Sequence, residues 1–202
     1  MTSEPFVRVG LLALLLGFFV FAFVVPIWRV RCATGVQPVV VHEQPLQRVV
    51  GVGMGIAMGG AGLWGALVAA VGPGALGVWR APDAIVGTGW SALALGLLVT
   101  VIAQVQMGAS WRIGIDRRPT ALVATGLYRL VRNPIYAGVL ATVAGLALVT
   151  PCPWTLCLLL DTALLVTIQA RLEEVHLLAQ HGDAYRAYAA QVGRFVPGIG
   201  RW

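Results

Sequence analysis

Arg132, Asn133 and Pro134 are consecutive and open a long apolar stretch of the chain. Asn is a preferred N-cap residue and Pro a preferred first helical residue, so the triplet predicts a helix that begins at Pro134. The N-terminus of a helix offers free backbone N–H groups and a partial positive charge to an anion. Because Arg129 and Arg132 add guanidinium groups that suit a carboxylate, we expect an anionic ligand group to bind here.

A second polar group, formed by Glu173, Glu174 and His176, follows the last long apolar stretch. Glu174 and His176, together with Tyr128, are candidate general bases, because each side chain type can take up a proton. The alternative is a solvated helix end without chemistry. Glu173 and His176 also form one Glu-x-x-His pair, half of a di-iron motif. Since the sequence has no second copy of this pair, we expect no metal site.

The composition indicates that these groups are positioned by membrane helices. Hydrophobic residues make up 58% of the chain and charged residues 11%, with a mean hydropathy of +0.84, which is typical of a membrane protein. Residues 9–28, 49–79, 84–111 and 133–170 carry little or no charge. A span needs roughly 20 apolar residues, and Pro151, Cys152 and Pro153 divide the fourth stretch into a hairpin. We therefore predict an all-α integral membrane fold with about five transmembrane helices.

The distribution of arginine predicts the orientation in the membrane. All 14 basic residues besides histidine are arginines, and the net charge is +6. Given five spans, Arg8 and Arg80 fall on one side and the other twelve on the opposite side. The positive-inside rule then places the N-terminus outside and the C-terminus in the cytoplasm. We expect a multi-pass protein of a bacterial inner or plasma membrane, without a nucleic-acid partner. Residues 9–28 should be a retained helix rather than a cleaved signal peptide.

Two features inside the spans predict how the helices pack. Gly51, Gly55 and Gly59 have small-xxx-small spacing, which lets another helix approach closely in lipid. Asp161 is the one acid inside an apolar helix. Because ionisable groups are expensive in a bilayer, we expect Asp161 to face the bundle interior or a cavity.

The second helix of the hairpin should leave the membrane. It has no breaker from Trp154 until Gly182, so it would be about 42 Å long and project into the cytoplasm. Asp183 is then expected to cap a short amphipathic helix. The apolar face of that helix would comprise Ala184, Tyr185, Tyr188, Ala189 and Val192.

Two segments carry a resemblance to a known family: LVATGLYRLVRNPIYAG, residues 122–138, and EEVHLLAQHGDAYRAYAAQVGRFVP, residues 173–197. Together they resemble the C-terminal half of integral-membrane methyltransferases, typified by isoprenylcysteine carboxyl methyltransferase and the phospholipid methyltransferases. The resemblance implies S-adenosylmethionine as cofactor and a lipophilic small molecule or lipid as acceptor. It leaves the oligomeric state open. We expect one integrated membrane domain, in which residues 1–107 form the three N-terminal transmembrane helices that the uncharged stretches predict. Residues 108–202 then form the cofactor-binding region, with a helical hairpin at 134–181 and a C-terminal amphipathic helix.

The resemblance also implies the site residues. The implied cofactor-binding positions are Thr120, Ala121, Leu122, Val123, Tyr128, Asn133, Pro134, Ile135, Tyr136 and Glu173. We add Arg132, whose guanidinium group beside the helix start suits the carboxylate of the cofactor. Gln169 takes the position of a family arginine that meets the substrate carboxylate, and Arg171 is the nearest arginine. Asn133 stands where relatives of the isoprenylcysteine enzyme have histidine. These two departures affect the acceptor more than the cofactor.

Two other functions compete with methyl transfer. Membrane sterol reductases have a related C-terminal region that binds NADPH, but they carry about twice as many helices as the five predicted here. The second alternative is a non-catalytic membrane protein. The presence of Tyr128, Asn133, Pro134, Tyr136, Glu173, Glu174 and Arg194 argues against this second alternative.

Overall fold

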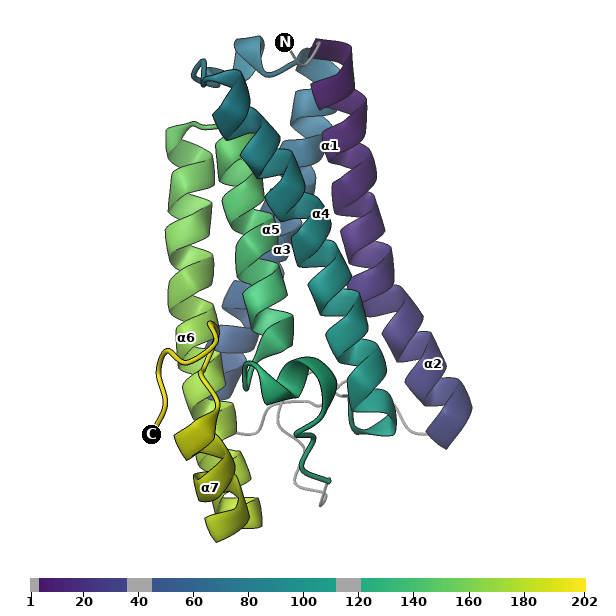
Figure 1. The fold of residues 1–202 in the computed structure, drawn as a ribbon. Helices are drawn as coiled ribbons and strands as arrows, with labels where there is room; N and C mark the ends of the chain where they lie inside the picture. The colour runs from purple at the N-terminus through teal and green to yellow at the C-terminus, as the bar shows by residue number, and fades with distance from the viewer. Residues whose placement is uncertain (1–3, 36–44, 112–120) are drawn as a thin grey trace.

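The computed structural model describes residues 4–35, 45–111 and 121–202. The helices lie side by side in an elongated bundle, and α5 lies between α4 and α6 (Figure 1). In chain order the helices are α1 (Glu4–Phe19), η1 (Val20–Val24), α2 (Val25–Thr34), α3 (Pro45–Val71), η2 (Gly74–Leu76), α4 (Asp83–Met107), η3 (Gly108–Ser110), η4 (Gly126–Arg129), α5 (Pro134–Val149), α6 (Pro153–His181) and α7 (Asp183–Gln191).

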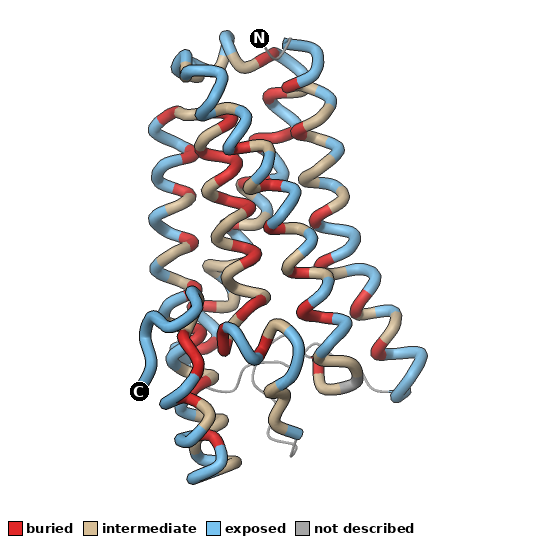
Figure 2. The backbone as a smooth tube through the Cα atoms, in the orientation of Figure 1, coloured by how far each residue is buried: buried red, intermediate tan, exposed pale blue. Residues whose placement is uncertain are grey.

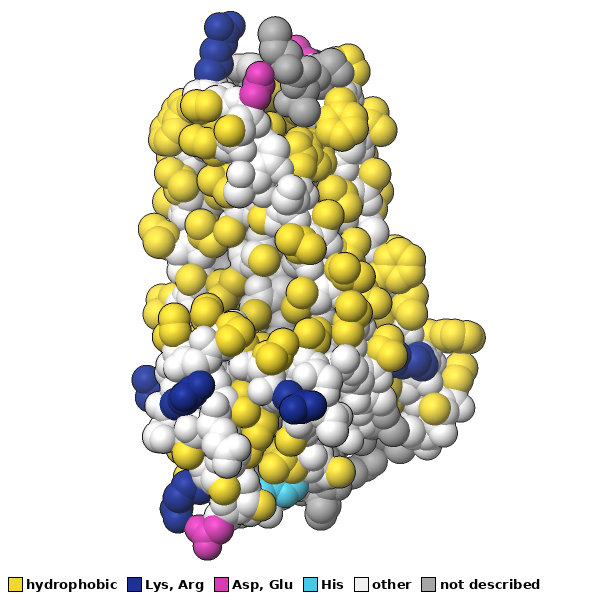
Figure 3. Space-filling view, viewed as in Figure 1, with side chains coloured by type: hydrophobic (Ala, Val, Ile, Leu, Met, Phe, Trp, Pro, Cys, Tyr) yellow, Lys and Arg dark blue, Asp and Glu magenta, His cyan; other side chains and the backbone are white. Residues whose placement is uncertain are grey.

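Within the described residues, four helices are long and apolar enough to cross a membrane: Glu4–Thr34, Pro45–Val71, Asp83–Met107 and Pro153–His181. α5 is apolar too, but it has 16 residues, about 24 Å at 1.5 Å per residue. The expected all-helical membrane fold is therefore confirmed. On the face shown in Figure 3, charged side chains gather at the two ends of the molecule, and the belt between them is hydrophobic or uncharged.

The first helix contains Pro26 and continues through it. Proline has no N–H group, so the carbonyl of Ala22, four residues earlier, loses its ordinary helical partner. The chain forms the π-helical segment η1 at this point. Gln104 Nε2 of α4 donates a hydrogen bond to the Ala22 carbonyl at 2.8 Å, and Arg29 Nη2 donates to the Gln104 carbonyl at 2.7 Å. The carbonyl that Pro26 leaves without a helical partner thus accepts a hydrogen bond from a side chain of α4.

Replacing Gln104 with leucine should lower the free energy of unfolding by about 1–3 kcal/mol, because the Ala22 carbonyl would remain buried without a donor. Thermal unfolding in detergent micelles measures this loss. Ser91→Ala is a matched control, since Ser91 lies on the same helix and bonds only the Gly87 carbonyl at an exposed position. Equal melting temperatures for the two variants would show that Ala22 does not depend on Gln104.

α4 and α5 approach each other closely at two pairs of glycines. A Cβ atom on Gly96 would lie 2.6 Å from the Gly138 carbonyl oxygen, and one on Gly138 would lie 2.7 Å from the Gly96 carbonyl oxygen. Gly145 and Gly89 repeat the arrangement, with a Cβ on Gly145 2.6 Å from the Gly89 oxygen. These glycines bring α5, whose residues are mostly buried (Figure 2), against α4.

The glycines of α3 do not pack as predicted. A Cβ atom on Gly55 or Gly59 would meet nothing within 4 Å among the described residues. Both glycines are exposed on the side of the bundle. The prediction of close packing was wrong for them, because spacing identifies helix faces that can approach closely but not the faces that do.

The hairpin turn between α5 and α6 comprises residues 150–152, as the two prolines predict. Thr155 Oγ1 donates to the Thr150 carbonyl at 2.8 Å and accepts from the Cys152 N–H at 3.2 Å. Trp64 Nε1 of α3 donates to Thr150 Oγ1 at 3.0 Å. The polar groups of the turn are therefore paired although their surroundings are apolar.

α6 has 29 residues and runs to His181, as predicted. Gly182, not Asp183, occupies the N-cap position of α7. Asp183 is the first helical residue and pairs with Arg186 at 2.9 Å, so the predicted capping role was wrong. Tyr185 and Ala189 are buried as predicted, and α7 lies beside the lower end of α6 (Figure 1).

Asp161 does not face the interior. It is exposed on α6, next to Leu160 and near Leu164, whose exposed fractions are 70% and 60%. The expectation of an interior position was wrong, since α6 turns this side chain toward the surface that lipid would surround.

Candidate functional site

Tyr128 lies in the 3-10 turn η4, just before α5. The N–H of Leu127 donates to Gln106 Oε1 of α4 at 2.8 Å. On the other side, the Tyr188 hydroxyl of α7 donates to the Tyr128 carbonyl at 2.6 Å. The end of α4 and the helix α7 therefore hold the turn that leads into α5.

The Tyr128 hydroxyl is buried and lies outside the spans. Burial, followed by the nearby Glu173 carboxylate, raises the pKa of Tyr128 well above its ordinary value. Burial also raises the pKa of Tyr188 to about 12. A raised pKa keeps a phenol protonated at neutral pH. Tyr128 is therefore suited to donate a hydrogen bond and poorly suited to act as the predicted base.

The start of α5 offers unpaired backbone donors. α5 begins at Pro134 with Asn133 at the N-cap position, as predicted, but the Asn133 side chain makes no capping bond within the described residues. Its Nδ2 donates to the Arg194 carbonyl at 3.5 Å, and its backbone N–H donates to the same oxygen at 3.1 Å. The first intrahelical bond, from Ala137 N–H to the Asn133 carbonyl, is 3.0 Å long. The N–H groups between these two residues thus remain without an intrahelical acceptor.

Tyr136, Gln169 and Glu173 form a hydrogen-bonded group between α5 and α6. The Tyr136 hydroxyl donates to Glu173 Oε1, and Gln169 Nε2 donates to the same oxygen at 2.9 Å. Glu173 Oε2 accepts no hydrogen bond from the described part of the chain. A half-buried carboxylate with one free oxygen can accept hydrogen bonds from hydroxyl groups or lie beside a cationic centre.

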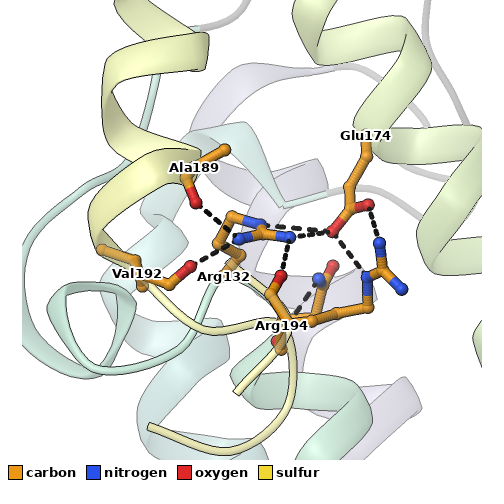
Figure 4. Close-up of polar contacts among 7 residues, drawn as sticks. Arg132, Glu174, Ala189, Val192 and Arg194 are labelled. Carbon is orange, nitrogen blue, oxygen red and sulfur yellow. Dashed lines mark hydrogen bonds and ion pairs between the residues drawn. The ribbon is translucent and has the colours of Figure 1, made fainter. Parts of the chain in front are cut away.

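Glu174, the neighbour of Glu173, lies on a different side of α6 and pairs with two arginines (Figure 4). Arg132 Nη2 lies 2.8 Å from Glu174 Oε1, and Arg194 Nη2 lies 2.8 Å from Glu174 Oε2. The side chains of Arg132 and Glu174 are each 1% exposed and that of Arg194 is 15% exposed. One carboxylate thus holds two guanidinium groups in a buried cluster.

The C-terminal segment completes this cluster around Arg132. Arg132 Nη1 donates to the carbonyls of Ala189 and Val192, and Nη2 donates to the Gly200 carbonyl at 3.0 Å. The Trp202 ring centroid lies 5.8 Å from the centre of the same guanidinium group. With the two bonds to Glu174, all five N–H donors of Arg132 are engaged within the protein.

These contacts change two of the roles expected from the sequence. Arg132 has no donor left for a ligand, so we assign it a positioning role rather than cofactor contact. Glu174 has both oxygens occupied by guanidinium groups, which leaves it poorly placed to act as a base. Arg194 retains Nη1 without a partner among the described residues, and it is the member of the cluster that a ligand can reach.

The remaining predicted residues are more dispersed. Ala121, Leu122 and Val123 lead into η4 and are exposed or half-buried, whereas Thr120 lies outside the described residues. Arg171 is exposed on α6, and His176 is half-buried one turn before the end of the helix. Across the described ranges, no group of three or more His, Cys, Asp or Glu side chains gathers that could hold a metal ion.

An apolar cluster adjoins the polar groups. Phe18, Ala22, Val139 and Val166 form its buried core. The half-buried side chains packed against it are Phe23, Met54, Met58, Leu97, Tyr136, Leu140 and Phe195. The Tyr136 ring therefore packs against this apolar cluster, while its hydroxyl donates to Glu173. Tyr136 thus lies at the boundary between the apolar cluster and the polar group.

Residues from the chain's end were missed by the sequence reading of the site. The C-terminal segment contributes Arg194, the Gly200 carbonyl and Trp202 to the buried cluster. In the sequence, only Arg194 pointed to a role for this segment. It belongs to the resemblance, but the resemblance assigns it no ligand. A backbone carbonyl leaves no trace in the side-chain pattern, so its contact with Arg132 required the fold.

Comparisons with known proteins identify the family and the fold of this chain. The profile of the phospholipid methyltransferase family matches residues 84–184, half of the chain. The fold is similar to that of a solved eukaryotic intramembrane Ras methyltransferase, isoprenylcysteine carboxyl methyltransferase, with a TM-score of 0.53 and 18% sequence identity. That similarity covers 96% of this chain and 76% of the other. No curated protein sequence matches this chain significantly.

Proposed function

This chain belongs to the phospholipid methyltransferase family, and from that premise we propose that it transfers a methyl group from S-adenosylmethionine to a lipophilic acceptor at the membrane. The observation that carries the proposal is the Tyr136, Gln169 and Glu173 group beside the uncapped start of α5. It combines a carboxylate, backbone donors and an apolar neighbour at one end of the bundle.

The donor set of this site fits the cofactor. The free N–H groups at Ile135 and Tyr136 suit a carboxylate, which is the anionic end of S-adenosylmethionine. Glu173 Oε2 suits ribose hydroxyls or the sulfonium charge. Leu122 and Val123 supply half-buried apolar surface on the approach to η4. Arg194, with a free guanidinium donor, is a second contact for the carboxylate.

When bound, S-adenosylmethionine supplies an activated methyl group for in-line displacement, so no covalent intermediate with the protein is needed. The chain's own task is to position the reactants and to exclude water. Glu173, held by Tyr136 and Gln169, keeps one orientation. An anionic acceptor needs no base. For a neutral acceptor, His176 is the candidate base that remains after Tyr128 and Glu174 have been reassigned.

The apolar cluster next to Tyr136 supports a lipophilic acceptor. We expect an acceptor dissolved in the bilayer to approach this cluster from the lipid, and the polar cofactor to approach from the side that carries η4 and α7. Gln169 bonds Glu173 in place of offering a positive charge. We therefore propose an acceptor whose tail is recognised by apolar packing and whose reacting group need not be a carboxylate.

Calorimetric titration of the purified protein with S-adenosylmethionine tests the proposed site. Tyr136→Phe removes one hydroxyl and Glu173→Gln removes one charge, and each should weaken binding by about 1–3 kcal/mol. Glu4→Gln is the control, because Glu4 is exposed at the opposite end and, among the described residues, its side chain bonds only Arg8. If both site variants were folded and bound S-adenosylmethionine as tightly as the wild type, the cofactor would not bind at this position.

Mass spectrometry of small molecules that co-purify in detergent separates the competing functions. We expect S-adenosylmethionine or its demethylated product. NADPH would indicate a reductase, and retention of neither cofactor, together with no binding in calorimetry, would indicate a non-catalytic protein.

The proposed orientation predicts which residues are accessible from each side. Single cysteines at Thr34 and Gln191 should react with a membrane-impermeant thiol reagent from the cytoplasmic side, and a cysteine at Gly74 from the outside. Labelling of Gly74 and Gln191 from the same side would contradict the topology inferred from the arginines.

A further inference from the structure

Asp161 lies deep within the expected hydrocarbon layer and points outward. It follows Pro153, the first residue of α6, by about 12 Å, and precedes Glu173 by about 18 Å, at 1.5 Å per residue. Those distances place it near the middle of a hydrocarbon layer of about 30 Å. It is exposed, and it makes no hydrogen bond or ion pair with any described residue.

No side chain among the described residues hydrogen-bonds or ion-pairs with this carboxyl group. Arg8 and Arg29 lie toward the two ends of the first long helix, and Arg171 lies about 15 Å along α6 from Asp161, so none of these arginines is at its depth. The neighbouring side chains Leu160 and Leu164 are apolar and exposed. Lipid tails offer no hydrogen bond either, and a carboxyl group without a partner is costly there. A partner must therefore come from outside this copy of the chain.

We infer that α6 forms a symmetric dimer with α6 of a second copy, in which the two Asp161 side chains bond to each other. A twofold axis perpendicular to the membrane brings the same residue of both copies to the same depth. The two carboxyl groups can then hydrogen-bond to each other, so each copy supplies the polar partner that the other lacks. A partner of another kind would need a donor at this depth.

The dimer face and the proposed reaction site occupy different sides of α6. Gln169 and Glu174 of α6 are buried against α5 and the C-terminal segment, whereas Asp161, Cys157 and Leu164 are exposed. Dimerisation through Asp161 therefore leaves the site open. This inference does not rest on the proposed reaction.

The chain carries a natural reporter for the dimer. Cys157 is exposed and lies one helical turn from Asp161. In the Cys32→Ser variant, Cys157 is the one exposed cysteine, since Cys152 is buried. Oxidation with copper phenanthroline in liposomes at low protein density should give a disulfide-linked dimer. As a matched control, Leu95→Cys in a Cys32→Ser, Cys157→Ser background places a thiol on the exposed face of α4, where Leu95 is 57% exposed, and it should not cross-link.

The role of Asp161 is tested by its own substitutions. Asp161→Leu should weaken association about tenfold, the effect expected for losing an interhelical hydrogen bond in lipid. Asp161→Asn should retain dimers, because an amide can bond its twin. Energy transfer between labelled copies in liposomes measures association without cross-linking. A wild-type protein that is monomeric in liposomes, or an Asp161→Leu variant that dimerises as well as the wild type, would overturn the inference.

Discussion

Glu174→Ala should lower the free energy of unfolding by about 3–5 kcal/mol, the usual cost of removing one partner from a buried ion pair. The substitution leaves two guanidinium groups without their counter-charge. Arg132 would keep its bonds to the carbonyls of Ala189, Val192 and Gly200, but its positive charge would remain buried and uncompensated. Thermal or denaturant unfolding of the protein in detergent measures the change.

Glu173→Ala is the matched control for this prediction. It removes a carboxylate from the adjacent position of the same helix, but Glu173 is half-buried and pairs with two neutral donors. Its stability loss should be clearly smaller. If Glu174→Ala and Glu173→Ala destabilised the protein equally, the buried cluster would not hold the C-terminal segment to α5 and α6.

Gly138→Val should destabilise the protein by about 3 kcal/mol or more, through overpacking at the closest contact of α4 and α5. A Cβ atom at this position would clash with Thr100 Oγ1 and would lie 2.7 Å from the Gly96 carbonyl oxygen. The second atom belongs to the backbone, so no rotamer change relieves the contact. Because Asn133 and Tyr136 lie on the same helix, displacement of α5 should also weaken cofactor binding.

Gly59→Val provides the comparison on α3. The glycine there is exposed, and an added Cβ would meet nothing within 4 Å among the residues described. Its unfolding temperature should stay close to the wild-type value. A loss as large as that of Gly138→Val would mean that α3 uses its glycines for contacts that a single chain does not make.

The parts of the fold that depend on local chemistry follow from the sequence. The spans follow from hydropathy, the hairpin turn from Pro151 and Pro153, and the start of α5 from Asn133 and Pro134. The length of α6 follows from the absence of a breaker before Gly182. Each of these features is decided by residues within a few positions of the element itself.

The features that were missed or predicted wrongly depend on contacts between distant segments. The Asn133 side chain bonds the Arg194 carbonyl rather than its own helix, and η1 persists because Gln104 bonds the Ala22 carbonyl. Which glycines are used in packing is decided by how α4 meets α5. None of these partners is adjacent in the sequence, and two of them are backbone carbonyls that every residue possesses.

The two neighbouring glutamates also differ through contacts with distant segments, which the local sequence does not reveal. From the sequence, Glu173 and Glu174 are equivalent carboxylates at the end of an apolar helix. In the structure Glu174 is 1% exposed and joins two arginines, whereas Glu173 is half-buried with one free oxygen. The resemblance assigned cofactor contact to Glu173, and the geometry supports that proposal because only Glu173 has an oxygen available to a ligand.

Transfer of a labelled methyl group from S-adenosylmethionine, by the purified protein in liposomes, tests the central claim most directly. We expect transfer to acceptors of graded tail length, with rates that rise with tail length. Each additional buried methylene contributes about 0.8 kcal/mol to the binding free energy of the acceptor. Transfer should fall sharply in Glu173→Gln and persist in Glu4→Gln. Equal transfer by Glu173→Gln and the wild type, or fastest turnover on short water-soluble acceptors, would contradict it.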